Sequence, residues 1–284
     1  MIGIPPGNVL TRLGRVISEL AADRVVEGVF AVKTKRRLRT KGGAPYLAIE
    51  LVDPSGRIDA RVWNDVELLD GRFTEGDAVR VLGRVEKFRD RLQLDVRSLE
   101  AADIDPASLT PAIRRDAEEL SGFLDFLVSE LSHPGLAATV QNVLGACDLS
   151  AYPATPDDHH AYAGGLLEHT VGVATLCRET AQLHRRLRSD LLLAAALVHD
   201  AGRTLELGRG PSFAVTDEGR LLGHVHLGAR LVERHAEGLT APQVAELVHC
   251  VAVHHDARGA RTAEAAVLYH ANQLDAVAAT RRVD

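Results

Sequence analysis

The sequence predicts a multidomain α+β protein, with an N-terminal five-stranded β-barrel followed by an all-α domain. Its length of 284 residues suits two domains of roughly 150 residues each. The hydrophobic periodicity is strand-like in the first part of the chain and helical in the second, and all 13 histidines lie in the second part. We therefore expect a lead-in helix over 1–23, the barrel over 24–100, a linker over 101–115 and the helical domain over 116–284.

The first part of the chain contains five short segments that are rich in β-branched residues and partly alternating. Turn signals separate them, for example Asp53-Pro54-Ser55-Gly56. Five strands in about 75 residues are typical of a small closed barrel. The expected strands cover 24–33, 45–52, 57–63, 78–85 and 91–97.

Two other stretches frame the barrel. Residues 9–22 (VLTRLGRVISELAA) carry apolar residues at helical spacing and predict a short amphipathic helix that could face a partner. Residues 101–115 contain two prolines and no strong period, which is typical of a linker. From Asp116 onward, apolar stripes predict six or seven helices within 116–131, 135–147, 164–187, 190–201, 221–236, 241–253 and 262–279.

Composition favours a cytoplasmic protein. Hydrophobic residues make up 46% and charged residues 25% of the chain, which is ordinary for soluble domains. No apolar run approaches the ~20 residues that span a bilayer, and the N-terminus lacks the basic start and apolar stretch of a signal peptide. The three cysteines have no CxxC spacing, which argues against a cysteine-based zinc site.

The charge is unevenly distributed along the chain. Residues 24–100 carry a net charge of +3, whereas residues 101–284 carry −9. A mildly basic barrel could meet phosphate groups, and an acidic second part could hold cations.

Five groups of metal-ligating residue types recur at intervals of 20 to 30 residues in the helical part. His199-Asp200 ends the apolar run LLLAAALV, so both side chains are expected to point into the domain. A buried carboxylate beside imidazoles costs free energy unless it is paired or binds a metal. Mixed nitrogen and oxygen ligands suit Mn, Fe, Ni, Co or Zn. The groups are His169, His199-Asp200, His224, His254-His255, and Asn272 with Asp275.

Phosphodiester hydrolysis is a reaction for which such a cluster is suited. Two cations ~4 Å apart can activate the attacking water and neutralise charge on the phosphoryl group. A carboxylate with two oxygens, such as Asp200, is the natural bridge between them. We expect one or two divalent transition ions, with Mn first.

These residues resemble the HD phosphohydrolase superfamily, and more closely the YhaM-type 3′-to-5′ exoribonucleases, which join an OB-fold domain to an HD domain. The resemblance covers nearly the whole chain beyond the first 20 residues. The similar stretches are KGGAPYLAIELVDPSGRIDARVW (41–63), HHAYAGGLLEHT (159–170), LLLAAALVHDAGR (191–203), GRLLGHV (219–225), VHH (253–255) and NQLDA (272–276).

The resemblance implies six metal ligands and shows two departures. Where the family usually has an Asp as its last ligand this chain has Asn272, and Asp275 is an alternative ligand or a structural residue. Where the family commonly has Lys, this chain has Arg203, a forked phosphate binder that we expect to neutralise or orient the phosphate. The implied ligands are His169, His199, Asp200, His224, His254 and His255.

Substrate contacts are expected in both domains. His159 and His160 could meet the substrate phosphate, or His159 could cap a helix. A basic run near the first barrel hairpin could follow a nucleic-acid backbone, although such a run is usually a solvated loop. Three aromatic residues could stack on bases or pack in the core. The barrel candidates are Lys35, Arg36, Arg37, Arg39, Lys41, Tyr46, Trp63 and Phe88.

The predicted function is metal-dependent 3′-to-5′ exonucleolytic hydrolysis of single-stranded RNA, or also DNA, to nucleoside monophosphates. One alternative is an HD phosphohydrolase of small or cyclic nucleotides, in which the barrel regulates or oligomerises. Another alternative is a nucleic-acid-binding protein with a degenerate HD site. The residue that favours this alternative is Asn272. The resemblance also implies a homo-oligomer, and the lack of a long apolar run predicts no membrane partner.

Overall fold

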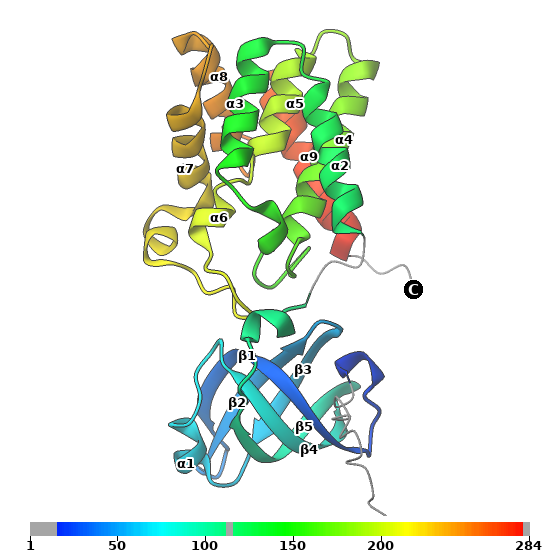
Figure 1. The fold of residues 1–284 in the computed structure, drawn as a ribbon, viewed down its shortest axis with the longest axis vertical. Coiled ribbons are helices and arrows are strands. Elements are labelled where there is room, and N and C mark those ends of the chain that lie inside the picture. The colour runs from blue at the N-terminus through cyan, green and yellow to red at the C-terminus, as the bar shows by residue number, and fades with distance from the viewer. Residues whose placement is uncertain (1–15, 112–115, 281–284) are drawn as a thin grey trace, which may run out of the picture. The chain divides into compact units, whose positions relative to one another are not determined.

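The computed structural model describes residues 16–111 and 116–280, and the chain divides into two compact units, residues 1–111 and 112–284 (Figure 1). Each unit has its own hydrophobic core. None of the helices in the described part of the chain is long and apolar enough to cross a membrane.

The first unit is a closed five-stranded barrel, as predicted. Neighbouring strands follow the order β1-β2-β3-β5-β4, in which β3 and β5 are parallel and the other pairs are antiparallel. Large apolar side chains such as Phe30, Leu47 and Leu94 fill the interior. The strands are β1 (Val25–Arg39), β2 (Pro45–Asp53), β3 (Gly56–Val62), β4 (Ala78–Phe88) and β5 (Arg91–Ala101).

Two parts of the first unit differ from expectation. β1 continues to Arg39 because residues 34–39 pair with β2, so the basic run lies on a strand and not in a loop. Of the helix expected over 9–22, residues 9–15 lie outside the described residues, and the rest forms only a 3-10 turn, Ile17–Glu19. The Ile17 amide donates to Asp53 Oδ2 at 2.7 Å and its side chain is buried, which fixes this turn on the barrel.

The second unit is all-α, and a helix forms in each of the seven predicted stretches. Short elements that were not predicted are α1 (Val66–Asp70) in the barrel and α6 (Arg203–Glu206) after the central helix. The other helices are α2 (Ala117–Ser129), α3 (Pro134–Gly145), α4 (Gly165–Leu183), α5 (Ser189–Val198), α7 (Asp217–His235), α8 (Ala241–Ala252) and α9 (Ala263–Thr280).

Helix α5 is the centre of the helical unit (Figure 1). All residues from Leu191 to Val198 are buried, because the sequence is apolar on every face of the helix. Helices α2, α3, α4, α8 and α9 contact it. Whatever follows Val198 is therefore held in the middle of the domain.

The N-terminus of α5 is fixed by an acidic residue of α9. Glu264, only 4% exposed, accepts from the backbone amide of Arg188 at 2.9 Å with Oε1 and contacts its guanidinium. The exposed Glu246 of α8 binds the same guanidinium at 2.7 Å. Burial raises the pKa of Glu264, but the Arg188 hydrogen bonds outweigh it and lower the pKa.

We expect Glu264→Gln to lower the free energy of unfolding by about 1–3 kcal/mol, because it weakens a buried charge-assisted contact. The contribution of ionised Glu264 to the free energy of unfolding should be complete above the unfolded pKa of about 4.3. It should be lost as the pH falls below that value. Urea unfolding followed by far-UV circular dichroism, which reports the helical unit, measures this loss. Glu246→Gln is the control, because the exposed pair should contribute ~1 kcal/mol or less; equal losses in the two variants would contradict the prediction.

Candidate metal centre

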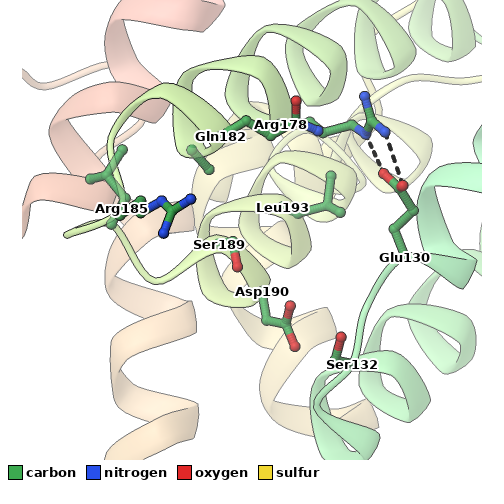
Figure 2. Close-up of a pocket in the computed structure, with 10 residues that line it drawn as sticks. Glu130, Ser132, Arg178, Gln182, Arg185, Ser189, Asp190 and Leu193 are labelled. Carbon is green, nitrogen blue, oxygen red and sulfur yellow. Dashed lines mark hydrogen bonds and ion pairs between the residues drawn. The ribbon is translucent and has the colours of Figure 1, made fainter.

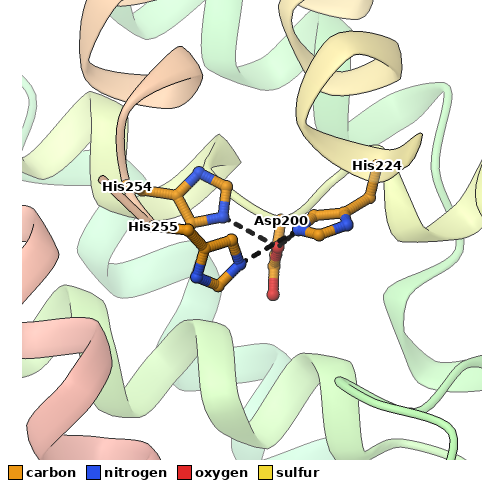
Figure 3. A group of neighbouring side chains, drawn as sticks. All are labelled: Asp200, His224, His254 and His255. Atoms are coloured by element: carbon orange, nitrogen blue, oxygen red, sulfur yellow. Dashed lines mark hydrogen bonds and ion pairs between the residues drawn. The ribbon is translucent and has the colours of Figure 1, made fainter. Parts of the chain in front are cut away.

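Asp200 follows the buried central helix and lies at the middle of a cluster of imidazoles. It is 2% exposed, and His169, His199 and His254 are fully buried. Two potential metal-binding groups share Asp200, and the ligand atoms of each lie within 4.8 Å of one another. The first group is His169, His199 and Asp200, and the second, shown in Figure 3, is Asp200, His224, His254 and His255.

In the first group, the Nε2 atoms of His169 and His199 face each other. His199 Nδ1 lies 2.8 Å from the Ala196 carbonyl oxygen, and His169 Nδ1 lies 2.7 Å from Asp275 Oδ2. Because a carbonyl and an ionised carboxylate only accept hydrogen bonds, both Nδ1 atoms carry a proton, and in the neutral form of each ring Nε2 is then unprotonated. The two Nε2 atoms are 3.3 Å apart, and in this form they cannot hydrogen-bond each other. A cation would satisfy both.

The second group repeats this arrangement. His254 Nδ1 lies 2.6 Å from the Val251 carbonyl oxygen, so its Nε2 faces Asp200 Oδ1 at 3.3 Å as an acceptor facing an acceptor. His224 Nε2 lies 3.4 Å from the same oxygen. In the described part of the chain, Asp200 Oδ1 and His254 Nε2 are among only four buried side-chain nitrogen or oxygen atoms without a hydrogen-bond partner. Unpartnered buried acceptors are expected where a cation binds.

The two oxygens of Asp200 face different groups. Oδ1 is directed to His224 and His254, whereas Oδ2 lies 3.8 Å from the Nε2 atoms of both His169 and His199. This donor set of imidazoles around one shared carboxylate fits two borderline divalent cations. Cations of this kind would supply an activated water and charge neutralisation for phosphoryl chemistry.

The electrostatics keep Asp200 ionised and His199 neutral. Burial raises the pKa of Asp200, but the nearby charge of Arg203 is the largest opposing cause, and the pKa is held well below its usual range. Burial lowers the pKa of His199 well below its usual range. A neutral imidazole and a carboxylate are the forms that bind metals.

Asp275 and Asn272 lie behind the imidazoles that face Asp200. Asp275 binds His169 at Nδ1, and therefore orients this ring for binding through Nε2. Gly172 on α4 makes room for it, because a Cβ there would lie 2.2 Å from Asp275 Oδ1. The Asn272 amide nitrogen lies 3.3 Å from the His254 carbonyl oxygen and 3.4 Å from His255 Nδ1. In this arrangement Asp275 orients the candidate ligand His169, and Asn272 lies beside His255.

His159 and His160 lie beside the first group, in the loop before α4. The His159 ring centroid is 4.8 Å from that of His169, and His160 Nδ1 is 3.8 Å from Asp275 Oδ2. Gly165 allows this approach, since a Cβ there would lie 2.0 Å from the His160 carbonyl oxygen. Burial lowers the pKa of His159 to about 4.

Sequence reasoning missed Glu206. Its Oε1 contacts the backbone nitrogen and Nδ1 of His224 at 3.2 and 3.3 Å, and its Oε2 accepts from Arg203 Nη1 at 2.6 Å. Burial raises the pKa of Glu206, but these partners outweigh it and lower the pKa to about 2. The available signal was the i,i+3 spacing of Arg203 and Glu206 directly after the His199-Asp200 pair.

The basic candidates of the barrel are differently placed. The ammonium of Lys35 is bound within the barrel unit. It pairs with the Asp70 carboxylate at 2.9 Å and donates to the backbone oxygens of Asp70 and Phe73. The Lys35 side chain is only 12% exposed. A phosphate contact of Lys35 is therefore not supported. Arg37 is half exposed and pairs with Glu67 and Asp70.

Exposed side chains remain at the end of the β1–β2 hairpin. Arg36, Arg39 and Lys41 are exposed, and Arg39 donates to the Gly43 carbonyl oxygen at 2.8 Å. Phe88 is 56% exposed at the end of β4, with the Arg89 guanidinium 5.3 Å from its ring.

Tyr46 of β2 and Trp63, which directly follows β3, form a stacked pair. Their ring centroids are 4.8 Å apart at an interplanar angle of 28°, and Trp63 is 46% exposed. Trp63 also lines a surface pocket of about 420 Å³ with Val66 and Leu68 of α1. An exposed aromatic face of this kind can stack on a nucleobase.

The pocket in Figure 2 is separate from the metal cluster. It has a volume of about 490 Å³ and is lined by Arg185, Asp190 and other residues around the C-terminal half of α4. None of its lining residues belongs to the His/Asp groups. The Arg178 guanidinium in its wall is already bound by Glu130 and Glu179.

We expect Mn²⁺ to stabilise the chain through Asp200. A cation at about 100 times its Kd contributes ~2.7 kcal/mol, which corresponds to a rise in Tm of about 5–10 °C for a unit of this size. Asp200→Asn should abolish the rise, because it removes the charge that the two potential metal-binding groups share. Thermal melts with Mn²⁺ and with EDTA measure the rise. Asp125→Asn, an exposed acid on α2, is the control, and an undiminished rise in Asp200→Asn would refute the assignment.

Comparison with known families assigns both units. The HD domain model matches residues 166–277, and the model of an OB-fold nucleic acid binding domain matches residues 29–102. The expected fold class is thereby confirmed.

Individual proteins are similar over most of the chain or over the barrel. The 3′-5′ exoribonuclease YhaM of Bacillus velezensis is 28% identical over 267 residues, covering 88% of this chain and 84% of the relative. The second OB-fold domain of replication protein A from Methanococcus maripaludis is 24% identical, covering 31% of this chain and 93% of that chain with a TM-score of 0.26. Single-stranded DNA binding protein from Thermus aquaticus is 16% identical, covering 29% and 41%, with a TM-score of 0.26. The chain therefore joins an OB-fold nucleic acid binding domain to an HD domain and is similar over most of its length to YhaM, which confirms its resemblance to the YhaM-type family.

Proposed function

We propose that this hydrolase is a divalent-metal-dependent 3′-to-5′ exonuclease of single-stranded RNA, with DNA as a second substrate, and that it releases nucleoside 5′-monophosphates. Manganese is the proposed cation, the cytoplasm the proposed location, and a homo-oligomer the proposed assembly. The similarity to the exoribonuclease YhaM over 88% of the chain supports the direction and the substrate.

One observation carries the proposed chemistry. Unprotonated Nε2 atoms converge on Asp200 from two sides, and each side uses a different oxygen of the carboxylate. Two cations so bridged would activate a water and neutralise the phosphoryl group. The chain's own residues then orient the substrate around them.

Arg203 and the loop histidines are the proposed phosphate contacts. Arg203 Nε lies 3.7 Å from Asp200 Oδ1, is buried and has no hydrogen-bond partner, so a donor is directed into the cluster. His159 and His160 flank the other group. In this proposal Arg203 holds a phosphate oxygen while His159 or His160 steadies the terminal nucleotide.

The barrel is proposed to hold the strand upstream of its 3′ end. Arg36, Arg39 and Lys41 supply positive charge, and the Tyr46–Trp63 pair supplies an aromatic face. Because stacking and backbone charge do not read base edges, this contact would be tolerant of sequence.

The two alternatives make different demands on the same site. A phosphohydrolase of small or cyclic nucleotides would use the metal cluster without the aromatic pair. A binding protein with a degenerate site would not need the Nδ1 bonds that hold the Nε2 atoms of His169, His199 and His254 toward Asp200. These bonds favour a working metal centre.

We expect digestion of a 5′-labelled single-stranded RNA with Mn²⁺ to give a ladder that shortens from the 3′ end. Asp200→Ala should lower the rate by at least about 10³-fold, because it removes the bridging carboxylate. Denaturing gel electrophoresis measures the products, and Asp125→Ala is the control.

Other outcomes would select an alternative. Hydrolysis of free or cyclic nucleotides without cleavage of RNA would support the small-nucleotide function. RNA binding without retained metal or hydrolysis would support the degenerate site.

We expect Trp63→Ala to weaken binding of an oligouridine by roughly 5- to 100-fold, since stacking contributes about 1–3 kcal/mol per base. Fluorescence anisotropy of the labelled strand with the Asp200→Ala chain measures binding without cleavage. Leu68→Ala is the matched control, because Leu68 is 58% exposed in the same surface pocket but has no aromatic face. Equal affinities of the two variants would rule out the stacking contact.

A further inference from the structure

Glu206 ends the short helix α6, and the start of α7 packs closely over its backbone. The Thr216 amide donates to the Glu206 carbonyl oxygen at 2.9 Å. Gly219 passes so near that a Cβ there would lie 2.3 Å from the same oxygen. The Glu206 side chain is 13% exposed and is therefore held at a fixed place beside the cluster.

One carboxylate oxygen of Glu206 fixes His224 twice. Gly223 interrupts α7 with φ 69° and ψ 159°, so the helix restarts at His224. The first amides of a helical segment lack acceptors within it. Glu206 Oε1 accepts from the His224 amide at 3.2 Å and from its Nδ1 at 3.3 Å. The ring is thereby held with an unprotonated Nε2, 3.4 Å from Asp200 Oδ1.

The other oxygen holds Arg203. Arg203 Nη1 donates to Glu206 Oε2 at 2.6 Å, and both side chains are little exposed. This contact keeps the unpartnered Arg203 Nε directed at Asp200. One side chain thus holds both a candidate metal ligand and a candidate phosphate binder.

We propose that Glu206 is a positioning residue that sets His224 for cation binding and Arg203 for phosphate binding at the same time. This inference rests on the proposed metal-dependent function. Only a carboxylate suits the position, because both partners donate. In Glu206→Gln the amide NH₂ faces either the two donors of His224 or the guanidinium of Arg203, so one of the two contacts is lost.

The test is Mn²⁺ binding by the full chain, measured by titration calorimetry and electron paramagnetic resonance. We expect the wild type to bind two ions with a spin-coupled signal. In Glu206→Gln the Kd of the ion held by His224 and His254 should rise 10- to 100-fold, and the signal should become that of a single ion. Glu218→Gln is the matched control, because it removes an equal charge from the start of α7, where Glu218 is 55% exposed and pairs with Arg230.

A double-mutant cycle separates positioning from a general structural role. If Glu206 acts through His224, Glu206→Gln should not raise the Mn²⁺ Kd further in a His224→Ala background. Binding of inorganic phosphate to the Mn²⁺-saturated protein should weaken in Glu206→Gln as it does in Arg203→Gln, and remain unchanged in Glu218→Gln. Should Glu206→Gln not fold, Glu206→Asp keeps the charge, withdraws the carboxylate by one methylene, and should weaken the same ion.

The outcomes distinguish this inference from the proposed function. If the wild type binds two ions and Glu206→Gln or Glu206→Asp binds them with unchanged affinity, the positioning of His224 by Glu206 is refuted. The proposed metal-dependent function is not affected by that result. A further rise in the Mn²⁺ Kd when Glu206→Gln is added to His224→Ala would refute the positioning of His224 as well. Unchanged phosphate binding in Glu206→Gln would refute the positioning of Arg203. A wild type that binds no divalent transition ion would instead overturn the proposed function.

Discussion

The Nδ1 hydrogen bonds of four imidazoles determine what the helical domain can bind. Backbone carbonyls hold His199 and His254, and carboxylates hold His169 and His224. Each of these partners only accepts, so in its neutral form each ring presents an unprotonated Nε2 toward Asp200. Without a cation the middle of the domain would contain mutually repelling acceptors. The rest of the fold places these rings close enough together for a cation to bind several of them.

The apolar central helix explains why such a costly arrangement lies in the core. Because α5 is buried on every face, His199 and Asp200, which directly follow Val198, are buried as well. A desolvated carboxylate is expensive alone but strengthens its attraction for a cation, since the local dielectric is low. The two carboxylates that support His169 and His224 come from α9 and α6, which both follow this helix in the sequence.

Much of this arrangement could be predicted from the sequence. Hydrophobic periodicity located the strands and the long helices, and recurring His and Asp residues at the ends of apolar stripes indicated the cluster. The roles of Asp275 and Glu206 could not be predicted, because they depend on which nitrogen of a ring a carboxylate meets. The basic run lies near the first hairpin as predicted, but its charges do not reveal that β1 continues through it to Arg39, nor that Asp70 binds Lys35. The expected helix over 9–22 failed in its described part because Ile17 and Leu20 pack on the barrel.

The single bridging carboxylate has a consequence for turnover. Neutral imidazoles complete both groups, and Asn272, beside His255, adds no negative charge. Two divalent cations held by one Asp200 would keep a surplus of positive charge, which an incoming phosphodiester with one negative charge balances only in part. A monophosphate product would carry more charge than the phosphodiester bond from which it came, and so would be the better counter-ion. In such a centre the departure of the product, rather than the cleavage of the chain, is expected to set the pace.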